Sequence, residues 1–282
     1  MVSQKEKAIE FRNLHHSGHI LILPNAWDVP SARVFEDAGF PAVATSSGGV
    51  SASLGYPDGE KIPLDEMLGA VARIARSVSV PVSADMEAGF ADSPRDIAKT
   101  TEGVISAGAI GLNVEDATRM NDKPLADLEA QTQKIRMIRK TADSMGIPIV
   151  INARTDAFRF APGDKPGRVQ EVIARGNAYR VAGADCIFAF GVGDPETISQ
   201  IVKKIDCPVN IRAGHNAPTI PELEKLGVAR ASVATGPICA TLGLLKKIAS
   251  ELKQSGTYQS LTSEAITYEE LNKLATRAQG EG

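Results

Sequence analysis

Hydrophobic and polar positions alternate along the chain in two recurring patterns, each of which joins a helix to a short apolar strand. In the first pattern a helix ends in a small residue and a glycine, and an apolar run follows, as at 37–46, 106–115, 181–190 and 225–234. In the second a helix leads into proline and an apolar run, as at 79–85, 146–154 and 206–214. Glycine suits the left-handed residue after a helix, and proline cannot extend the helix before it. Together with residues 19–28, these segments give eight predicted strands.

The segments between the strands have helical periodicity, as at 64–78 and 168–183. The strands are continuously apolar, which is typical of a parallel sheet covered by helices. Eight such units in 282 residues predict an α/β fold, the (β/α)8 or TIM barrel. A doubly wound open sheet is the alternative, but no G-x-G-x-x-G follows the first strand and open sheets usually have fewer units. We expect one barrel domain over 1–255 and a polar, partly helical tail over 256–282.

Composition and charge exclude several classes of protein. The formal net charge is −3 and no basic stripe is present, so we expect neither nucleic acid nor anionic lipid as a partner. No apolar run approaches the ~20 residues of a membrane span, and the charged N-terminus does not resemble a signal peptide. Cys186, Cys207 and Cys239 are far apart and fit buried free thiols better than a disulfide framework or a zinc site. We therefore expect a globular cytoplasmic protein.

Polar side chains gather where the predicted strands end, whereas the opposite rim is mostly glycine, proline and alanine. Because the carboxyl ends of barrel strands carry the active site in this architecture, this asymmetry is the strongest functional signal. The residues in question are Asn25, Trp27, Asp28, Ser46, Ser47, Gly48, Asp85, Glu87, Asn113, Glu115, Asp116, Arg154, Asp156, Asn210, Arg212, Ser232 and Thr235.

Two carboxylates follow the third predicted strand and suggest a metal site. Asp85 and Glu87 are two residues apart, and residues i and i+2 of a strand project to the same side. Glu115 ends the next strand and could approach them. An all-oxygen site without cysteine or histidine favours Mg²⁺ or Mn²⁺ over zinc. Solvated carboxylates or helix N-caps are the alternative, but the convergence with Arg154 favours the metal site.

Other rim residues have two interpretations each. The backbone N–H groups of residues 46–49, SSGG, could cradle an anion or form an ordinary turn. Arg154 could clamp a substrate carboxylate or neutralise a neighbouring acidic residue. His215 could be a general acid or a surface residue. Trp27, the only tryptophan, could contact substrate or belong to the core.

Five segments in order along the chain resemble one known family. PNAWD, SSGGVSASLGYPD, ADMEAGF, NVED and NARTDAF are similar to motifs of the isocitrate lyase/phosphoenolpyruvate mutase superfamily, and the resemblance spans residues 19–250. It implies a (β/α)8 barrel whose eighth helix is swapped between subunits, usually in a homotetramer. It also implies Mg²⁺ held at Asp85, with Glu87, Glu115 and Asp58 helping directly or through water.

The resemblance also implies how a small carboxylate substrate is bound. Its 2-oxo acid end would chelate the metal, with its carboxylate on the backbone of Ser46, Ser47 and Gly48 and on Arg154. We further expect Trp27, Asp28 and Asn210 to contact substrate, and Arg154, Glu115 and His215 to act in catalysis. The shared chemistry would be an enolpyruvate-like oxyanion stabilised by the cation.

The loop after the fourth predicted strand departs from the family pattern. Lyases carry a Lys-Arg/Lys-Cys-Gly-His segment there, but residues 115–131 contain neither cysteine nor histidine, nor the Lys and Asn-Ser pattern of the phosphonate mutases. Arg119, Asp122 and Lys123 could form a different charged lid or a solvated loop. The leading prediction is a Mg²⁺-dependent lyase or decarboxylase that cleaves a C–C bond in a small 2-oxo or 2-hydroxy dicarboxylate. The alternatives are a C–P bond enzyme, of mutase or hydrolase type, and a barrel that binds metal and carboxylate without catalysis.

Overall fold

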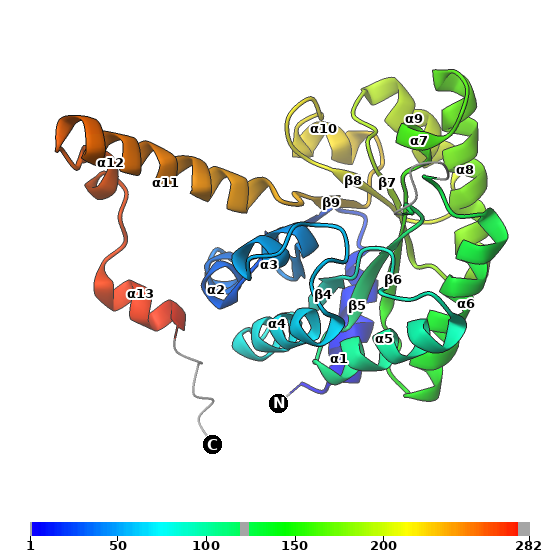
Figure 1. Ribbon diagram of the computed structural model, residues 1–282. Helices are drawn as coiled ribbons and strands as arrows, with labels where there is room; N and C mark the ends of the chain where they lie inside the picture. The colour runs from blue at the N-terminus through cyan, green and yellow to red at the C-terminus, as the bar shows by residue number, and fades with distance from the viewer. Residues whose placement is uncertain (1, 119–123, 276–282) are drawn as a thin grey trace.

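The computed structural model describes residues 2–118 and 124–275 and shows a ring of parallel strands surrounded by helices (Figure 1). The strand order is β1-β9-β8-β7-β6-β5-β4-β3-β2. Pro24 divides the first strand, so β1 pairs with β9 and β2 pairs with β3, which closes the barrel. The predicted (β/α)8 barrel is confirmed. The strands are β1 (Leu21–Leu23), β2 (Asn25–Ala26), β3 (Val43–Thr45), β4 (Val82–Asp85), β5 (Gly111–Glu115), β6 (Val150–Thr155), β7 (Cys186–Ala189), β8 (Val209–Arg212) and β9 (Arg230–Ser232).

The longer helices between the strands bury an apolar stripe against the barrel. In α4, for example, Met67, Val71 and Ile74 are buried at helical spacing. Burying one such side chain contributes about 1.5–3 kcal/mol. The helices are α1 (Gln4–Leu14), α2 (Val29–Asp37), α3 (Ser47–Ser53), α4 (Leu64–Ser77), α5 (Pro94–Ser106), α6 (Leu128–Ser144), α7 (Ala157–Phe160), α8 (Lys165–Ala182), α9 (Pro195–Lys204), α10 (Ile220–Lys225), α11 (Gly236–Ser255), α12 (Gln259–Thr262) and α13 (Tyr268–Ala275).

The N-terminal helix α1 closes the end of the barrel opposite the predicted active site. Its Phe11 is fully buried in a cluster with Leu23 and Val150. A Cβ on Gly111 would lie 2.9 Å from Phe11 Cε1, so only glycine leaves room for this ring. The predicted active site lies at the other end of the barrel, where the strands terminate.

A single asparagine ties the two ends of the barrel chain together. Asn25 Nδ2 donates to the carbonyl of Thr45 at 2.9 Å. Its Oδ1 accepts from the backbone N–H groups of Val233 and Ala234, at 2.9 and 2.8 Å. The segment leaving β9 is thus held to the first residue of β2, at the carboxyl-end rim.

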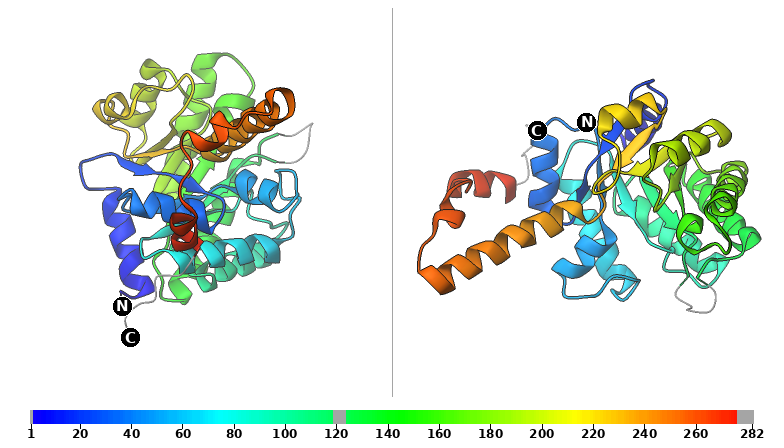
Figure 2. Two further views of the ribbon diagram at one scale, coloured as in Figure 1. Left: turned by 90° about the vertical axis from the view of Figure 1, so that its left-hand side faces the viewer. Right: turned by 90° about the horizontal axis from the view of Figure 1, so that it is seen from above.

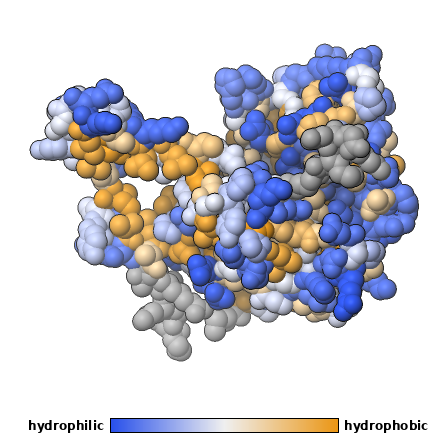
Figure 3. All heavy atoms as spheres, viewed as in Figure 1, coloured by the Kyte–Doolittle hydropathy of each residue, from blue (hydrophilic) through white to orange (hydrophobic). Residues whose placement is uncertain are grey.

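Helix α11 does not cover the barrel of its own chain but extends away from it (Figures 1 and 2). Only Ile238 of its 20 residues is buried. Beyond Gly256, α12 and α13 turn back, and α13 lies against α2. In Figure 3, hydrophobic residues line the lower side of α11, which faces α13. An eighth helix that leaves its own barrel is the geometry that swapping requires, and the swap itself stays a prediction.

None of the helices in residues 2–118 and 124–275 is long and apolar enough to cross a bilayer. The three cysteines are free, as predicted. Cys186 is buried and Cys207 partly buried, but Cys239 is exposed because it lies on the projecting α11. Helix α11 ends at Ser255, where the sequence places the end of the barrel domain, although that boundary itself stays a prediction.

Candidate active site

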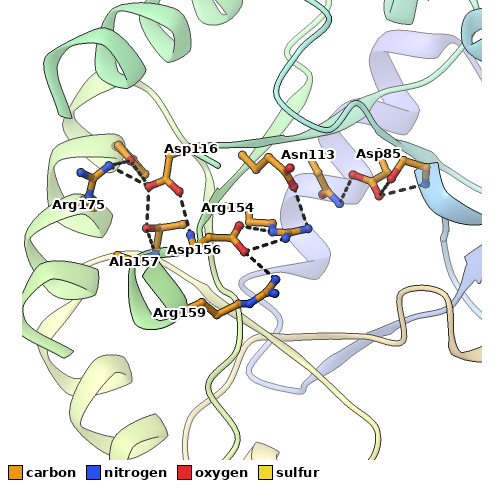
Figure 4. Close-up of polar contacts among 12 residues, drawn as sticks. Asp85, Asn113, Asp116, Arg154, Asp156, Ala157, Arg159 and Arg175 are labelled. Carbon is orange, nitrogen blue, oxygen red and sulfur yellow. Dashed lines mark hydrogen bonds and ion pairs between the residues drawn. The ribbon is translucent and has the colours of Figure 1, made fainter. Parts of the chain in front are cut away.

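Asp85 lies at the carboxyl end of β4 and is fixed from three sides. Its Oδ2 accepts from the backbone N–H and the hydroxyl of Ser47, at 3.1 and 2.9 Å. Its Oδ1 faces the Nδ2 of Asn113 at 3.5 Å, and its own N–H donates to Thr45 Oγ1 at 2.9 Å. The carboxylate therefore points into the barrel mouth in one orientation (Figure 4).

Glu87 reaches the site from a turn rather than from a strand. Strand β4 ends at Asp85, and Glu87 has a φ of +49°, so the i and i+2 rule of strands does not apply to it. Its Oε2 accepts from the N–H of Glu60 at 2.9 Å, and Glu60 Oε1 accepts from the N–H of Phe90 at 2.8 Å. Glu60 and Phe90 also have positive φ, which is uncommon for residues other than glycine and often marks a functional site.

Arg154 joins two carboxylates at the ends of β5 and β6 (Figure 4). Its Nη1 lies 2.8 Å from Glu115 Oε2. Its Nε and Nη2 donate to the two oxygens of Asp156, at 2.7 and 2.9 Å. The guanidinium also lies over the ring of Phe190, 3.6 Å from its centroid. Neutralising a neighbouring carboxylate and binding a substrate carboxylate are therefore compatible roles for Arg154, because its guanidinium is held in one orientation.

The carboxylates of the mouth affect each other electrostatically. Burial raises the pKa of Glu115 to about 8, although the charge of Arg154 opposes the shift. The negative charges of Asp156, Asp85 and Glu87 add to it. Burial alone would lower the pKa of Arg154, but Glu115 and Asp156 more than offset it and the pKa is raised. Burial and the neighbouring carboxylates thus disfavour the ionised form of Glu115, and Arg154 opposes this effect.

A second network, centred on Asp116, connects the site to helix α8. Asp116 is fully buried and accepts from the N–H of Asp156 at 2.8 Å and from Thr155 Oγ1 at 2.7 Å. From α8 it accepts from Tyr179 OH at 2.7 Å and from Arg175 Nη1 at 3.1 Å. The sequence pattern identified Asp116 at the rim but not its two partners on α8, Arg175 and Tyr179, because both occupy ordinary inward positions of that helix.

The segment after β3 forms the short helix α3 instead of a simple turn. Ser46 is its N-cap and accepts from the N–H of Gly49 at 3.2 Å. A Cβ on Gly48 would lie 3.0 Å from Thr235 Cγ2 and 3.3 Å from Asp58 Cγ, so Asp58 is brought to this segment. Trp27 packs behind it, since a Cβ on Gly49 would lie 2.9 Å from Trp27 Cβ.

Three further predicted site residues lie at the start of α2, within β8 and on the loop after β8. Asp28 is the N-cap of α2 and accepts from the N–H of Ser31 at 2.8 Å. Asn210 lies inside β8 and is fully buried; its Oδ1 accepts from Ser232 at 3.3 Å, and its Nδ2 has no hydrogen-bond partner in the described part of the chain, so a substrate contact stays a prediction. His215 is exposed on the loop after β8. Arg119, Asp122 and Lys123 lie outside the described residues.

The donor set fits a cation that keeps water ligands. Within residues 2–118 and 124–275, no group of three or more His, Cys, Asp or Glu is arranged to hold a metal by itself. Mg²⁺ commonly binds through one or two carboxylates and retains several waters, whereas structural zinc requires a closed set of protein ligands. Asp85, with Glu87, Glu115 and Asp58 nearby, suits a Mg²⁺ ion that retains several waters.

Comparison with known proteins identifies the family. The model of the phosphoenolpyruvate phosphomutase family matches residues 11–253. The 2-methylisocitrate lyase of Escherichia coli is 31% identical over 249 residues, covering 85% of this chain and 82% of that enzyme. The chain belongs to the isocitrate lyase/phosphoenolpyruvate mutase superfamily. This confirms the predicted resemblance, and the named relatives of the superfamily include lyases.

Solved structures of the isocitrate lyase/phosphoenolpyruvate mutase superfamily share the whole barrel. A Burkholderia cenocepacia protein with a tentative lyase or mutase assignment is 34% identical, with a TM-score of 0.89, and the match covers 97% of this chain and 96% of that one. Phosphonopyruvate hydrolase, solved with oxalate and Mg²⁺, is 25% identical with a TM-score of 0.84, covering 95% and 94%. Members with C–C and C–P substrates thus share one fold.

Proposed function

We propose that this chain is a Mg²⁺-dependent enzyme that cleaves a C–C bond in a small 2-oxo or 2-hydroxy dicarboxylate. The observation that carries the proposal is the fixed Asp85 carboxylate, which faces the barrel mouth beside the Glu115–Arg154 pair. A divalent cation at Asp85 would act as a Lewis acid for negative charge that develops on a substrate oxygen, which contributes several kcal/mol to such reactions.

The residues around Asp85 have separate roles in this proposal. Arg154, held in place by Glu115 and Asp156, would donate its remaining N–H groups to a substrate carboxylate. The N–H of Ser47 already bonds Asp85, so we assign the N–H of Gly48, in the first turn of α3, to the same substrate carboxylate. Glu87 and Asp58 would bind the water ligands of the cation.

C–P cleavage is the alternative, since phosphonopyruvate hydrolase shares the fold. Between the two named enzymes, 2-methylisocitrate lyase is 31% identical and phosphonopyruvate hydrolase 25% identical, which favours the C–C reaction. Decarboxylation of an oxaloacetate-like acid fits the absence of a lid cysteine, because CO₂ leaves without protonation.

The test is a panel of acids incubated with the enzyme and Mg²⁺. Oxaloacetate, methylisocitrate and dimethylmalate would release pyruvate, and isocitrate would release glyoxylate. We expect turnover of at least one of these and none by Asp85→Ala. Turnover of phosphonopyruvate alone would establish the C–P alternative, and no turnover of any would favour a non-catalytic barrel.

We also propose a homotetramer in which α11 is swapped between subunits. Helix α11 leaves its own barrel, and Leu242, Leu244, Leu245 and Leu252 are each about half exposed on it. A contiguous apolar surface of this kind is rare on a monomer and marks an interface.

A further inference from the structure

The barrel contains a buried arginine that the proposed chemistry does not use directly. Arg230 belongs to β9 and is the largest side chain among those that are fully buried in the described residues. β9 and β5 lie four strands apart in the ring, on opposite walls. The Arg230 guanidinium crosses the interior and reaches Asn113 on β5, below the barrel mouth.

The partners of Arg230 are too few for a structural ion pair. Its Nη2 donates to Asn113 Oδ1 at 3.3 Å, whereas its Nε and Nη1 have no hydrogen-bond partner in the described part of the chain. Its guanidinium lies 6.0 Å from the ring centroid of Phe11, which closes the far end. A buried charge without full pairing costs stability, so packing alone does not account for an arginine here.

The hydrogen bonds of Asn113 connect Arg230 to Asp85. Asn113 Oδ1 accepts from Arg230 Nη2 and from Asn152 Nδ2, the latter at 2.8 Å. Two donors on one side fix the amide orientation, so Nδ2 is on the other side. There it faces Asp85 Oδ1 at 3.5 Å, a long contact that a small shift would tighten (Figure 4).

We propose that Arg230, acting through Asn113, is a positioning residue for the cation site at Asp85. The inference rests on the proposed function, because it concerns the same site. Ser47 fixes one oxygen of Asp85, and Asn113 fixes the plane of the carboxylate from the other oxygen. Removing such outer partners of a ligand typically weakens metal affinity about 10- to 100-fold.

The experiment measures Mn²⁺ affinity by titration calorimetry and by electron paramagnetic resonance on the full chain. Asp85→Ala first establishes the location of the ion. We expect Arg230→Met and Asn113→Leu each to weaken Mn²⁺ binding about tenfold or more. Because both residues act through one contact, the affinity of the double variant should be about that of the weaker-binding single variant. Arg230→Lys, which keeps the charge and donors, should lose less. Arg139→Met, at the opposite end of the barrel beside Asp185, is the matched control and should bind Mn²⁺ normally.

The stability of Arg230→Met separates positioning from folding. Because the substitution removes unpaired buried donors, we expect its denaturation midpoint to equal or exceed that of the wild type while affinity falls. Unchanged affinity in Arg230→Met, additive losses in the double variant, or equal losses with Lys and Met would each overturn the inference and leave the proposed function standing. A wild-type chain that binds no Mn²⁺ would overturn both.

Discussion

The guanidinium of Arg154 is shared between two carboxylates, so a substitution of Arg154 changes more than one property of the protein. Glu115 bonds one nitrogen, and Asp156, which is fully buried, bonds the other two. Lysine would keep the charge but could not reproduce the planar two-pronged contact. Binding geometry and resting stability therefore depend on the same side chain.

We expect Arg154→Lys to lower both turnover and melting temperature. Turnover should fall tenfold or more, equivalent to about 1.4 kcal/mol of lost transition-state stabilisation. The loss of stability should be smaller than the about 3–5 kcal/mol typical of removing a buried partner entirely. Arg159→Lys, whose Nη1 lies 3.4 Å from Asp156, is the matched control for thermal melts and steady-state kinetics. A lower melting temperature with unchanged kinetics would leave Arg154 with a structural role only.

Individual residues also show where sequence reasoning stops. The strand-end rule located Asp85, Glu115 and Arg154, because these positions follow from the apolar runs before them. It could not reveal the role of Arg230, since the partner of an inward side chain depends on which opposite strand it meets. Asp28 looked like a rim carboxylate but caps α2, a choice that local backbone geometry decides.

Among the elements, α8 contributes to the site without reaching the barrel mouth. Arg175 and Tyr179 bond Asp116, and Asp116 holds the backbone N–H of Asp156. The helical period of residues 168–183 predicts α8 but cannot distinguish an inward tyrosine that fills space from one that bonds a carboxylate. The short helix α3 was also not predicted, because SSGG has the composition of a turn.

Tyr179→Phe tests this connection. The substitution removes a buried hydrogen bond to a carboxylate, so the free energy of unfolding should fall by about 1.5–3 kcal/mol in chemical denaturation. Tyr56→Phe removes the same kind of bond, to Glu66 at the surface, and should change stability by less than about 0.5 kcal/mol. Equal effects in both variants would show that Asp116 does not depend on the tyrosine hydroxyl.

For the whole molecule, the main question is what covers the apolar side of α11. The helix has 20 residues and a length of about 30 Å, and four of its leucines are about half exposed. The family resemblance implied a swapped eighth helix, but the direction in which α11 leaves β9 is visible only in the structure.

Light scattering at micromolar concentration should give the mass of a tetramer. Leu245→Glu, at a position 56% exposed, places a charge in the proposed interface and should shift the mass toward smaller species. Lys246→Glu, on the next residue and also exposed, should leave the mass unchanged. A wild-type monomer would contradict the proposed swap.

The bond from Asn25 to Val233 also determines when the barrel can be completed during synthesis. Its two residues are 208 positions apart, and β1 has no strand beside it until β9 exists. At about 5–20 residues per second, the first strand waits about 10–40 s for its neighbour after leaving the ribosome. Contacts this distant in sequence slow folding, and the unpaired edge of β1 is open to other chains meanwhile. A nascent chain that stops before β9 cannot close, however well its first seven units are formed.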